Sequence, residues 1–361
     1  MKIAQIAPLY ESVPPKYYGG TERVVHYLTE ELVRMGHEVT LFASGDSVTS
    51  ARLLPQCPLS LRLNAGCIDH IARHVLLAEN IYRNASQFDI IHSHIDYFPY
   101  SILRHTDTPH LTTLHGRLDL PDLVPLYREF SEISLASISD AQREPLPWVN
   151  WQATVHHGIP RDLFRFREQP GNYLAFLGRT SPEKRLDAAI KIAIRAGIPL
   201  KIAAKVDKAD REYFQTSIKP LLDHPLIEFI GEIGEEQKND FLGNALALLF
   251  PIDWPEPFGL VMIEAMACGT PVIARIRGSV QEVMEPGVTG YVFSTIEEAA
   301  GAARDIGRLS RKRCRQVFEN RFTSERMARD YLDVYRKLIN DRRWDPRGLL
   351  KSGTISGALP E

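Results

Sequence analysis

The chain has 361 residues, of which 44% are hydrophobic and 24% are charged, and its formal net charge is −2 at pH 7. This length is more than one typical hydrophobic core requires, so two domains are expected. The nearly balanced charge gives no electrostatic reason to expect nucleic acid as a partner, and no run of about 18 apolar residues predicts a transmembrane helix.

The start of the chain and its cysteines indicate the cellular compartment. The first residues, MKIAQIAPLY, predict a strand and lack the apolar segment and small-residue cleavage site of a secretory signal. The four cysteines form no C-x-x-C pair, so free thiols in a reducing cytoplasm are expected. A disulfide between Cys57 and Cys67, or a metal site, is the alternative.

The first half of the chain alternates apolar strands with helical segments. A helix is predicted over Thr21–Met35, because apolar residues recur there at helical spacing and Gly36 and His37 follow as a stop signal. Strands separated by helices of this length predict a parallel sheet. The predicted strands are Lys2–Ala7, Glu38–Ala43, Asp89–Ser93, His110–Leu114 and Ser134–Ser139.

A polar, proline-bearing segment at 159–171, IPRDLFRFREQPG, predicts a linker, and the alternating pattern restarts after it. A helix is predicted over Leu186–Ala196. Two doubly wound domains joined by a hinge would bind a ligand in the cleft between them. The predicted strands of this half are Tyr173–Leu177, Leu200–Ala204, Ile227–Ile230, Ala245–Phe250 and Thr270–Ala274.

These patterns divide the chain into four parts. Residues 1–165 and 166–323 are each expected to form a Rossmann-like domain, and a final helix is predicted over residues 324–340. Residues 341–361 contain Gly, Ser and Pro and few apolar residues, so a disordered tail is expected there.

The most informative segment spans residues 256–271, EPFGLVMIEAMACGTP. It follows an apolar strand and contains Glu256 in a Pro/Gly-rich turn and Glu264 eight positions later in a predicted helix. Eight helical residues span only ~12 Å, so both carboxylates could contact one ligand at the carboxyl edge of the sheet. The segment resembles the Glu-x7-Glu motif of retaining GT-B glycosyltransferases of family 4, also called group 1 glycosyltransferases.

The resemblance covers about Met1–Ile339 and is strongest over Arg179–Ala274. It implies the GT-B fold, in which two Rossmann-like domains face a deep cleft. The N-terminal domain would bind the acceptor, the second domain the nucleotide-sugar donor, and the final helix would cross back to the N-terminal domain. The implied reaction is retaining transfer of a hexose, with a UDP-sugar as the expected donor, to an acceptor that the sequence does not identify.

The segment Gly178-Arg179-Thr180-Ser181-Pro182-Glu183-Lys184 joins a strand to a helix. An arginine offers a planar fork to phosphate oxygens, a lysine adds a point charge, and a helix start adds partial positive charge. The segment resembles the family's Gly-Arg…Glu-Lys segment, in which Arg179 and Lys184 match the residues that grip the donor phosphates. The family often has Gly at the next position, and Arg185 is a mild departure. Alone, this pattern would indicate only a solvated helix start.

Gly19 and Gly20 lie between the first strand and the first helix, in the string PPKYYGGTERV. Glycines in such a turn let the backbone approach a phosphate, and Thr21 can cap the helix. The string resembles the glycine loop of the family's N-terminal domain, whose amides meet the donor phosphate across the cleft. A Gly-Gly pair alone is equally typical of a simple turn. The missing G-x-G-x-x-G spacing disfavours a nicotinamide-dependent oxidoreductase.

The two glutamates have separate implied roles. Glu264 matches the family's second glutamate, which accepts hydrogen bonds from the ribose hydroxyls, and a carboxylate suits a diol because it has two acceptor oxygens. Glu256 matches the first, which holds a hydroxyl of the donor sugar. Phe258, Gly259 and Leu260 would supply backbone N–H groups to the sugar or phosphate. The long match to EPFGLxxxEAMAxGxPVIA disfavours the alternative of surface carboxylates on a helix.

His115 follows a strand in Thr-Leu-His-Gly and matches the family's N-domain histidine, which faces the donor sugar. A lone histidine at a strand end is more often structural. His157 stands where the family usually has Asn at the domain junction, so it is interpreted as part of the hinge. His115, Arg179, Lys184 and Glu256 are the expected catalytic residues.

No Asp-x-Asp pair occurs in the sequence. Metal-dependent GT-A transferases use such a pair to hold a divalent cation on the pyrophosphate. Arg179 and Lys184 are therefore expected to neutralise the pyrophosphate, with no metal and no cofactor. Cys67, His70 and His74 resemble part of a zinc site but lack a second cysteine or the Glu of H-E-x-x-H, so surface histidines on a helix are favoured.

The expected partners are a nucleotide-sugar donor and an acceptor that is a sugar, a lipid-linked sugar or a small molecule. In this family, variable N-domain loops bind the acceptor, here those at 46–73 and 117–132. Basic residues at 308–315 and 342–347 would allow peripheral contact with anionic lipid, although a solvated helix face is favoured. The alternatives to transfer are a nucleotide-sugar epimerase or phosphorylase on the same fold, and a non-catalytic nucleotide-sugar-binding protein.

Overall fold

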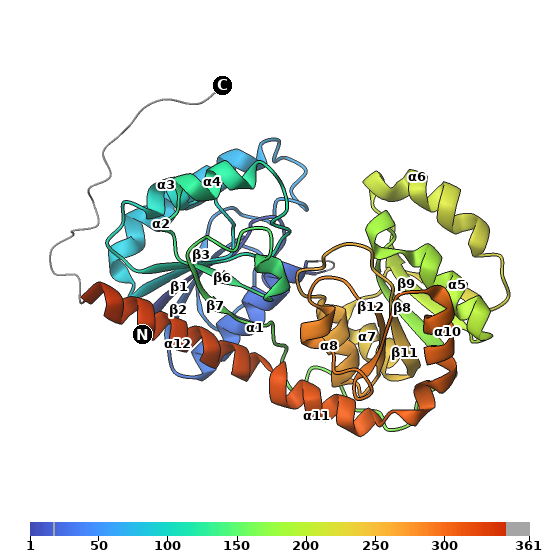
Figure 1. The fold of residues 1–361 in the computed structure, drawn as a ribbon. Coiled ribbons are helices and arrows are strands. Elements are labelled where there is room, and N and C mark those ends of the chain that lie inside the picture. The colour runs from blue at the N-terminus through green and yellow to red at the C-terminus, as the bar shows by residue number, and fades with distance from the viewer. Residues whose placement is uncertain (17–18, 344–361) are drawn as a thin grey trace.

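The computed structural model describes residues 1–16 and 19–343, and they form two α/β domains in succession (Figure 1). The first domain contains a seven-stranded sheet with the order β3-β2-β1-β4-β5-β6-β7, and every pair of neighbours is parallel. Its strands are β1 (Lys2–Ile6), β2 (Glu38–Ala43), β3 (Arg52–Pro55), β4 (Ile90–Ser93), β5 (His110–Thr113), β6 (Leu135–Ser137) and β7 (Trp151–Thr154).

The second domain contains a six-stranded sheet with the order β10-β9-β8-β11-β12-β13, again parallel throughout. The predicted pair of doubly wound parallel domains is therefore confirmed. Its strands are β8 (Tyr173–Arg179), β9 (Leu200–Lys205), β10 (Ile227–Gly231), β11 (Ala245–Phe250), β12 (Val272–Arg275) and β13 (Gly290–Phe293).

Helices cover both sheets, and the buried central strands are accordingly almost continuous apolar runs. The helix α1 buries Val24, Leu28 and Leu32 on one face, at the spacing of an amphipathic helix. The first-domain helices are α1 (Gly20–Arg34), α2 (His70–Asn84), α3 (Tyr100–Leu103) and α4 (Leu123–Glu129). Those that follow are α5 (Leu186–Ala196), α6 (Arg211–Tyr213), α7 (Glu235–Gly243), α8 (Leu260–Ala267), α9 (Val280–Val283), α10 (Ile296–Asp305), α11 (Arg311–Arg321) and α12 (Ser324–Arg343).

The chain crosses between the domains twice, and the two crossings lie side by side. Ile159 and Thr323 form an isolated parallel bridge, and the Ile159 N–H donates to the Phe322 carbonyl at 3.0 Å. A side chain at Gly158 would overlap the carbonyl group of Thr323, so only glycine allows this close approach. His157, interpreted from the sequence as a hinge residue, immediately precedes this glycine.

The helix α12 leaves the second domain and runs along the first (Figure 1). Tyr335 on this helix accepts a hydrogen bond from the Gln5 side chain at 3.2 Å, and Lys337 donates to the Gln152 side chain at 3.1 Å. The helix extends three residues beyond the predicted limit of residue 340, and the part of the expected tail after residue 343 lies outside the described residues. Within the described ranges, no helix is long and apolar enough to span a bilayer.

Candidate active site

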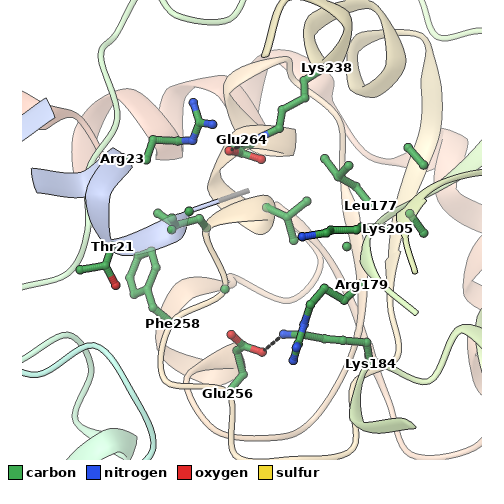
Figure 2. A pocket seen from close by; sticks show the side chains of 18 of the residues that line it. Thr21, Arg23, Leu177, Arg179, Lys184, Lys205, Lys238, Glu256, Phe258 and Glu264 are labelled. Atoms are coloured by element: carbon green, nitrogen blue, oxygen red, sulfur yellow. Dashed lines mark hydrogen bonds and ion pairs between the residues drawn. The ribbon is translucent and has the colours of Figure 1, made fainter. Parts of the chain in front are cut away.

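A cavity of about 500 Å³ lies between the two domains (Figure 2). In each sheet the strand order reverses at a central pair, β1 and β4 in the first and β8 and β11 in the second. Loops from the carboxyl ends of such strands are the usual ligand sites of α/β proteins. Every residue predicted for the donor site or for catalysis lines this cavity, namely Gly19, Gly20, His115, Arg179, Lys184, Glu256, Phe258, Gly259, Leu260 and Glu264.

Basic side chains gather on the second-domain side of the cavity (Figure 2). Arg179 ends β8 and donates to Glu183 at 2.9 Å, and Lys205 ends the neighbouring strand β9 and pairs with Asp207 at 2.9 Å. Lys184 lies in the short turn after β8 and forms an ion pair with Glu256. Three cations, at or just after the carboxyl ends of the adjacent strands β8 and β9, thus line one side of the cavity. This arrangement suits a polyanionic group.

Glu256 lies in the loop between β11 and α8, and its carboxylate is held from two sides. Besides Lys184, the indole Nε1 of Trp254 donates to Glu256 Oε2 at 2.8 Å. The ammonium group of Lys184 also lies 5.4 Å from the centre of the Trp254 ring, which is cation–π geometry. The carboxylate therefore has a fixed position in the cavity even with no ligand bound.

The backbone of this loop is fixed by the turn that follows β12. The Ser279 N–H donates to the Glu256 carbonyl at 3.0 Å, and Ser279 Oγ donates to the Phe258 carbonyl at 2.8 Å. A side chain at Gly278 would overlap the backbone of Glu256, so this contact also requires glycine. The loop that carries Glu256 and Phe258 is therefore rigidly supported.

Gly259 is the N-cap of α8 and adopts the left-handed conformation, with φ at 80°. A Cβ atom there would lie 2.9 Å from the buried Phe250 ring, so both conformation and space select glycine. The helix that begins here carries Glu264, whose side chain is only 5% exposed and accepts a hydrogen bond from Lys238 Nζ at 3.0 Å. Figure 2 shows Glu264 and Glu256 in different parts of the cavity, each beside its lysine.

The N-terminal domain forms the opposite wall. Gly20 begins α1, and a Cβ atom on it would lie only 3.8 Å from Leu260 Cδ1 at the start of α8. One turn further along α1, Arg23 forms an ion pair with Glu235 on α7, and the Tyr27 hydroxyl lies 3.5 Å from the same carboxylate. These contacts join the two domains beside the cavity.

His115 follows β5 and contributes to the N-terminal wall. Its Nε2 lies 2.9 Å from His94 Nδ1, and its ring stacks on His157 at a centroid distance of 5.3 Å. His157 in turn meets the Phe258 ring edge to face at 4.9 Å. Desolvation lowers the pKa of His115 to about 3, so the ring is neutral near pH 7 and offers hydrogen bonds rather than charge.

Several cavity residues were missed from the sequence, namely Glu11, Arg23, Arg62, Lys205, Glu235, Lys238 and Trp254. Lys205 could have been found, because it directly follows the predicted strand Leu200–Ala204, which a doubly wound sheet places next to β8. Lys238 and Glu235 belong to α7, a polar helix that no motif marks. Burial raises the pKa of Glu11, which pairs with Arg62 at 2.6 Å on the N-terminal wall.

The segment with Cys67, His70 and His74 differs from the expectation of surface histidines, because the His74 side chain is buried. All four cysteines are free thiols, so the alternative of a disulfide between Cys57 and Cys67 is not realised. His74 Nδ1 lies 2.8 Å from the carbonyl oxygen of His70, and its Nε2 lies 3.4 Å from the Leu9 N–H. Across residues 1–16 and 19–343, no three His, Cys, Asp or Glu side chains are grouped to hold a metal ion.

Comparison with known proteins identifies relatives of both domains. The profile described as "Glycosyltransferase Family 4" matches residues 18–153, and the profile described as "Glycosyl transferases group 1" matches residues 161–322. A phosphatidyl-myo-inositol mannosyltransferase of Mycolicibacterium smegmatis is 26% identical over 361 aligned positions, which cover 91% of this chain and 90% of the relative.

Solved structures share the architecture. A sucrose-phosphate synthase from Thermosynechococcus elongatus superposes with a TM-score of 0.76 at 20% identity, over 94% of this chain and 100% of the other. The Anabaena protein HepE, solved in complex with UDP and glucose, superposes with a TM-score of 0.70 at 17% identity, over 93% and 100%. With both domains matched by family profiles and the whole chain by these structures, the protein belongs to the group 1 glycosyltransferases of family 4 and has the GT-B fold.

Proposed function

We propose that the protein transfers a hexose from a UDP-sugar, with retention of anomeric configuration and without a metal ion, to an acceptor held on the N-terminal wall. The observation that carries this proposal is the arrangement of one cavity. Its cations, Arg179, Lys184 and Lys205, come from adjacent strand ends, and its two glutamates lie beside separate lysines. A nucleoside diphosphate sugar has the matching groups, which are a pyrophosphate, a ribose diol and sugar hydroxyls.

The pyrophosphate would bind the cations and act as the leaving group. In the ligand-free structure Lys184 is paired with Glu256 and Arg179 with Glu183. A pyrophosphate carries more negative charge than a carboxylate, so it would take over these cations and stabilise the charge that develops as the glycosidic bond breaks. Lys184 would then turn from Glu256 towards the phosphate.

The carboxylates would orient the rest of the donor. Glu256, released by Lys184 but still held by Trp254, would accept a hydrogen bond from a sugar hydroxyl close to the reacting carbon. Glu264, held by Lys238, would accept hydrogen bonds from both ribose hydroxyls. The N–H groups at the start of α8, from Phe258 to Leu260, would face the sugar or the phosphate.

The relatives support the donor class. HepE is described in complex with UDP and glucose, and the mycobacterial relative is named as a mannosyltransferase, so both printed descriptions concern hexoses. The acceptor would lie against Glu11 and Arg62, which line the cavity from the N-terminal domain. A hydroxyl-bearing acceptor would find both a hydrogen-bond acceptor and a cation there.

The test is a proton NMR time course of UDP-glucose, GDP-mannose and ADP-glucose with the purified chain in EDTA. Water serves as the default acceptor, so slow release of the free sugar is expected, with the α-anomer appearing first from the α-linked UDP donor. Glu256→Gln should slow this release by about 100-fold, whereas Glu236→Gln, an exposed glutamate on α7, should not. Release of the β-anomer first, or activity that requires an added divalent cation, would contradict the proposal.

The same experiment separates the alternatives. An epimerase would convert the nucleotide sugar into a second nucleotide sugar or a free epimer, and a phosphorylase would release a sugar phosphate only when inorganic phosphate is added. A protein that only binds nucleotide sugars would leave every donor intact while its resonances broaden on binding. Each of these outcomes would favour the named alternative over the proposed transferase.

A further inference from the structure

A chain of hydrogen-bonded side chains runs through the buried N-terminal domain from the cavity to α12. It involves three strands of the sheet and two tyrosines of the helix, which are one turn apart. Apart from His115, which lines the cavity, every member is at most 2% exposed. The members are His115, His94, Gln5, His92, Thr113, Tyr335 and Tyr331.

In the half of this hydrogen-bonded series that is nearer the cavity, the contacts between side chains are short. His115 Nε2 lies 2.9 Å from His94 Nδ1, and His94 Nε2 lies 2.9 Å from Gln5 Oε1. No hydrogen bond from His115 Nδ1 to another described residue is found, and the side chain lines the cavity. His115, the member of the series that lines the cavity, therefore has one ring nitrogen available to a ligand.

The other half anchors the Gln5 amide. Gln5 Nε2 lies 3.2 Å from the Tyr335 hydroxyl, which lies 2.6 Å from His92 Nδ1. His92 Nε2 lies 2.7 Å from Thr113 Oγ1, and Thr113 Oγ1 lies 3.0 Å from the Tyr331 hydroxyl. When the Gln5 amide is the donor, each hydroxyl along this path accepts one hydrogen bond and donates another. The path ends at the Tyr331 hydroxyl.

The direction of the protons follows from the amide. Burial lowers the pKa of His92, His94 and His115, so each ring is neutral near pH 7 and carries a single N–H. In the amide orientation of the structure, Gln5 Oε1 faces His94 and can only accept, so His94 carries its proton on Nε2 and accepts at Nδ1. His115 Nε2 is then the donor to His94, and the lone pair of His115 lies on Nδ1, the ring nitrogen that does not contact His94. The reversed amide would give the opposite tautomers.

We propose that Gln5 is a positioning residue that acts through His94. It holds His115 in the Nε2–H tautomer, so that Nδ1 accepts a hydrogen bond from a hydroxyl of the bound donor sugar, and the α12 hydroxyl of Tyr335 holds the amide of Gln5 in place. The part that concerns the sugar rests on the proposed function, whereas the tautomer does not. The helix that returns from the second domain thereby sets the hydrogen-bonding character of a cavity residue.

The direct test is two-bond proton–nitrogen NMR of the ligand-free, full-length chain labelled with ¹⁵N-histidine. A protonated ring nitrogen resonates far from one that carries a lone pair, so the spectrum gives each tautomer. The His94 and His115 signals are assigned by their loss in His94→Gln and His115→Gln. The expected result is the Nε2–H tautomer for both rings. An Nδ1–H tautomer for either ring would overturn the proposal, and this readout needs no enzymatic activity.

Variants then test whether Gln5 is the cause. Gln5→Met keeps the volume but removes the amide, and it should give a mixture of His115 tautomers. Tyr331→Phe removes a buried hydroxyl at the far end, which is hydrogen-bonded to Thr113 and lies three hydrogen bonds from the Tyr335 hydroxyl, so it should leave both tautomers unchanged. A single Nε2–H tautomer in Gln5→Met would overturn the role of Gln5, and if this variant fails to fold the wild-type spectrum still decides the tautomer.

A kinetic comparison tests the contact with the sugar. Gln5→Met should lower kcat/KM for the nucleotide sugar by about tenfold, the usual effect of losing one hydrogen bond, and leave the Kd for UDP unchanged because UDP has no hexose. An unchanged kcat/KM together with mixed tautomers would overturn the sugar contact alone. If no transfer is found in the wild type, the proposed function fails while the tautomer result stands.

Discussion

At the scale of single residues, the ligand-free site consists of ion pairs between its own groups. Lys184 pairs with Glu256, Arg179 with Glu183, and Lys238 with Glu264. These pairs keep each side chain ordered, and they also mean that a donor must exchange partners in order to bind. If the donor carries a pyrophosphate, as proposed, part of its attraction to these cations would offset the loss of the existing pairs.

The first prediction concerns Lys184, the cation that we propose binds the donor phosphates. Lys184→Met should weaken UDP binding by about 10–100-fold, because a hydrogen bond to a charged group contributes about 1.5–3 kcal/mol. Lys191→Met on α5 is the matched control, since that lysine is exposed and does not line the cavity. Isothermal titration of UDP measures both, and equal affinities of the two variants would show that Lys184 does not bind the phosphates.

The sequence anticipated some of these residues and not others. Glu256, Glu264, Arg179 and Lys184 belong to two continuous segments, each after a predicted strand. Spacing suggests that the two glutamates could contact one ligand, whereas the resemblance to the family is what points to Arg179 and Lys184. Lys238, by contrast, reaches the cavity from a separate helix. Its pairing with Glu264 depends on how that helix packs on α8, which local periodicity does not encode.

At the scale of elements, the strands with apolar runs were predicted to within two residues at each end. The prediction missed β3, β7 and β13, which are all edge strands. Their sequences, RLLP, WQAT and GYVF, are short and only partly buried. Such strands form because a neighbouring strand offers hydrogen-bonding groups, and this is a tertiary effect.

The second prediction compares two glycines with nearly the same backbone conformation. Gly259 and Gly287 have φ at 80° and 77°, but a Cβ atom would meet the Phe250 ring at 2.9 Å in the first and nothing within 4 Å in the second. Gly287→Ala should cost about 1 kcal/mol from left-handed strain, and Gly259→Ala about 1–3 kcal/mol more from overpacking. Urea unfolding of both variants measures the difference, and equal losses would mean that the start of α8 is loosely packed.

At the scale of the whole molecule, the chain passes twice through a narrow junction, and side chains join the domains beside the cavity. Glu235 on α7 pairs with Arg23 on α1, while Glu282 accepts hydrogen bonds from the Asp140 and Ala141 N–H groups, each at 2.7 Å. That the chain forms two α/β domains could be predicted, because the segment at 159–171 is polar and the strand pattern restarts after it. These contacts could not, since they depend on the relative placement of two folded units.

The third prediction concerns that placement. Glu235→Gln should weaken the pairing with Arg23 and open the ligand-free cleft, because the ion pair joins the two domains directly. Glu236→Gln removes the same charge from the neighbouring, exposed position and should have no effect. Small-angle X-ray scattering should show a larger radius of gyration for the first variant only. Identical scattering from both would exclude this ion pair as a determinant of the domain arrangement.

The fourth prediction concerns pH. Burial lowers the pKa of His92, His94, His115 and His157, so these rings stay neutral in the folded protein while the unfolded chain takes up protons below about pH 6.5. The unfolded state then binds more protons, so the free energy of unfolding must fall as the pH falls from 7.5 to 5. The expected slope is on the order of 1 kcal/mol per pH unit for each histidine.

The variant His157→Asn tests the slope, because asparagine cannot titrate and is the residue usual in this family at that position. Its free energy of unfolding should depend less steeply on pH than that of the wild type. The reason is that the variant takes up about one proton fewer on unfolding. Chemical denaturation at pH 7.5, 6.5 and 5.5 measures both proteins. Parallel curves would mean that His157 becomes protonated without unfolding.

The central claim is that the cleft binds a nucleotide sugar through Arg179, Lys184 and Glu264 without a metal ion, and the most direct measurement is a crystal structure of the complex with UDP grown in EDTA. The account predicts the ribose hydroxyls within hydrogen-bond distance of Glu264. It also predicts the pyrophosphate against Arg179 and Lys184, with the Lys184–Glu256 pair broken. UDP bound outside this cavity, or bound inside it with the Lys184–Glu256 pair intact, would contradict the account.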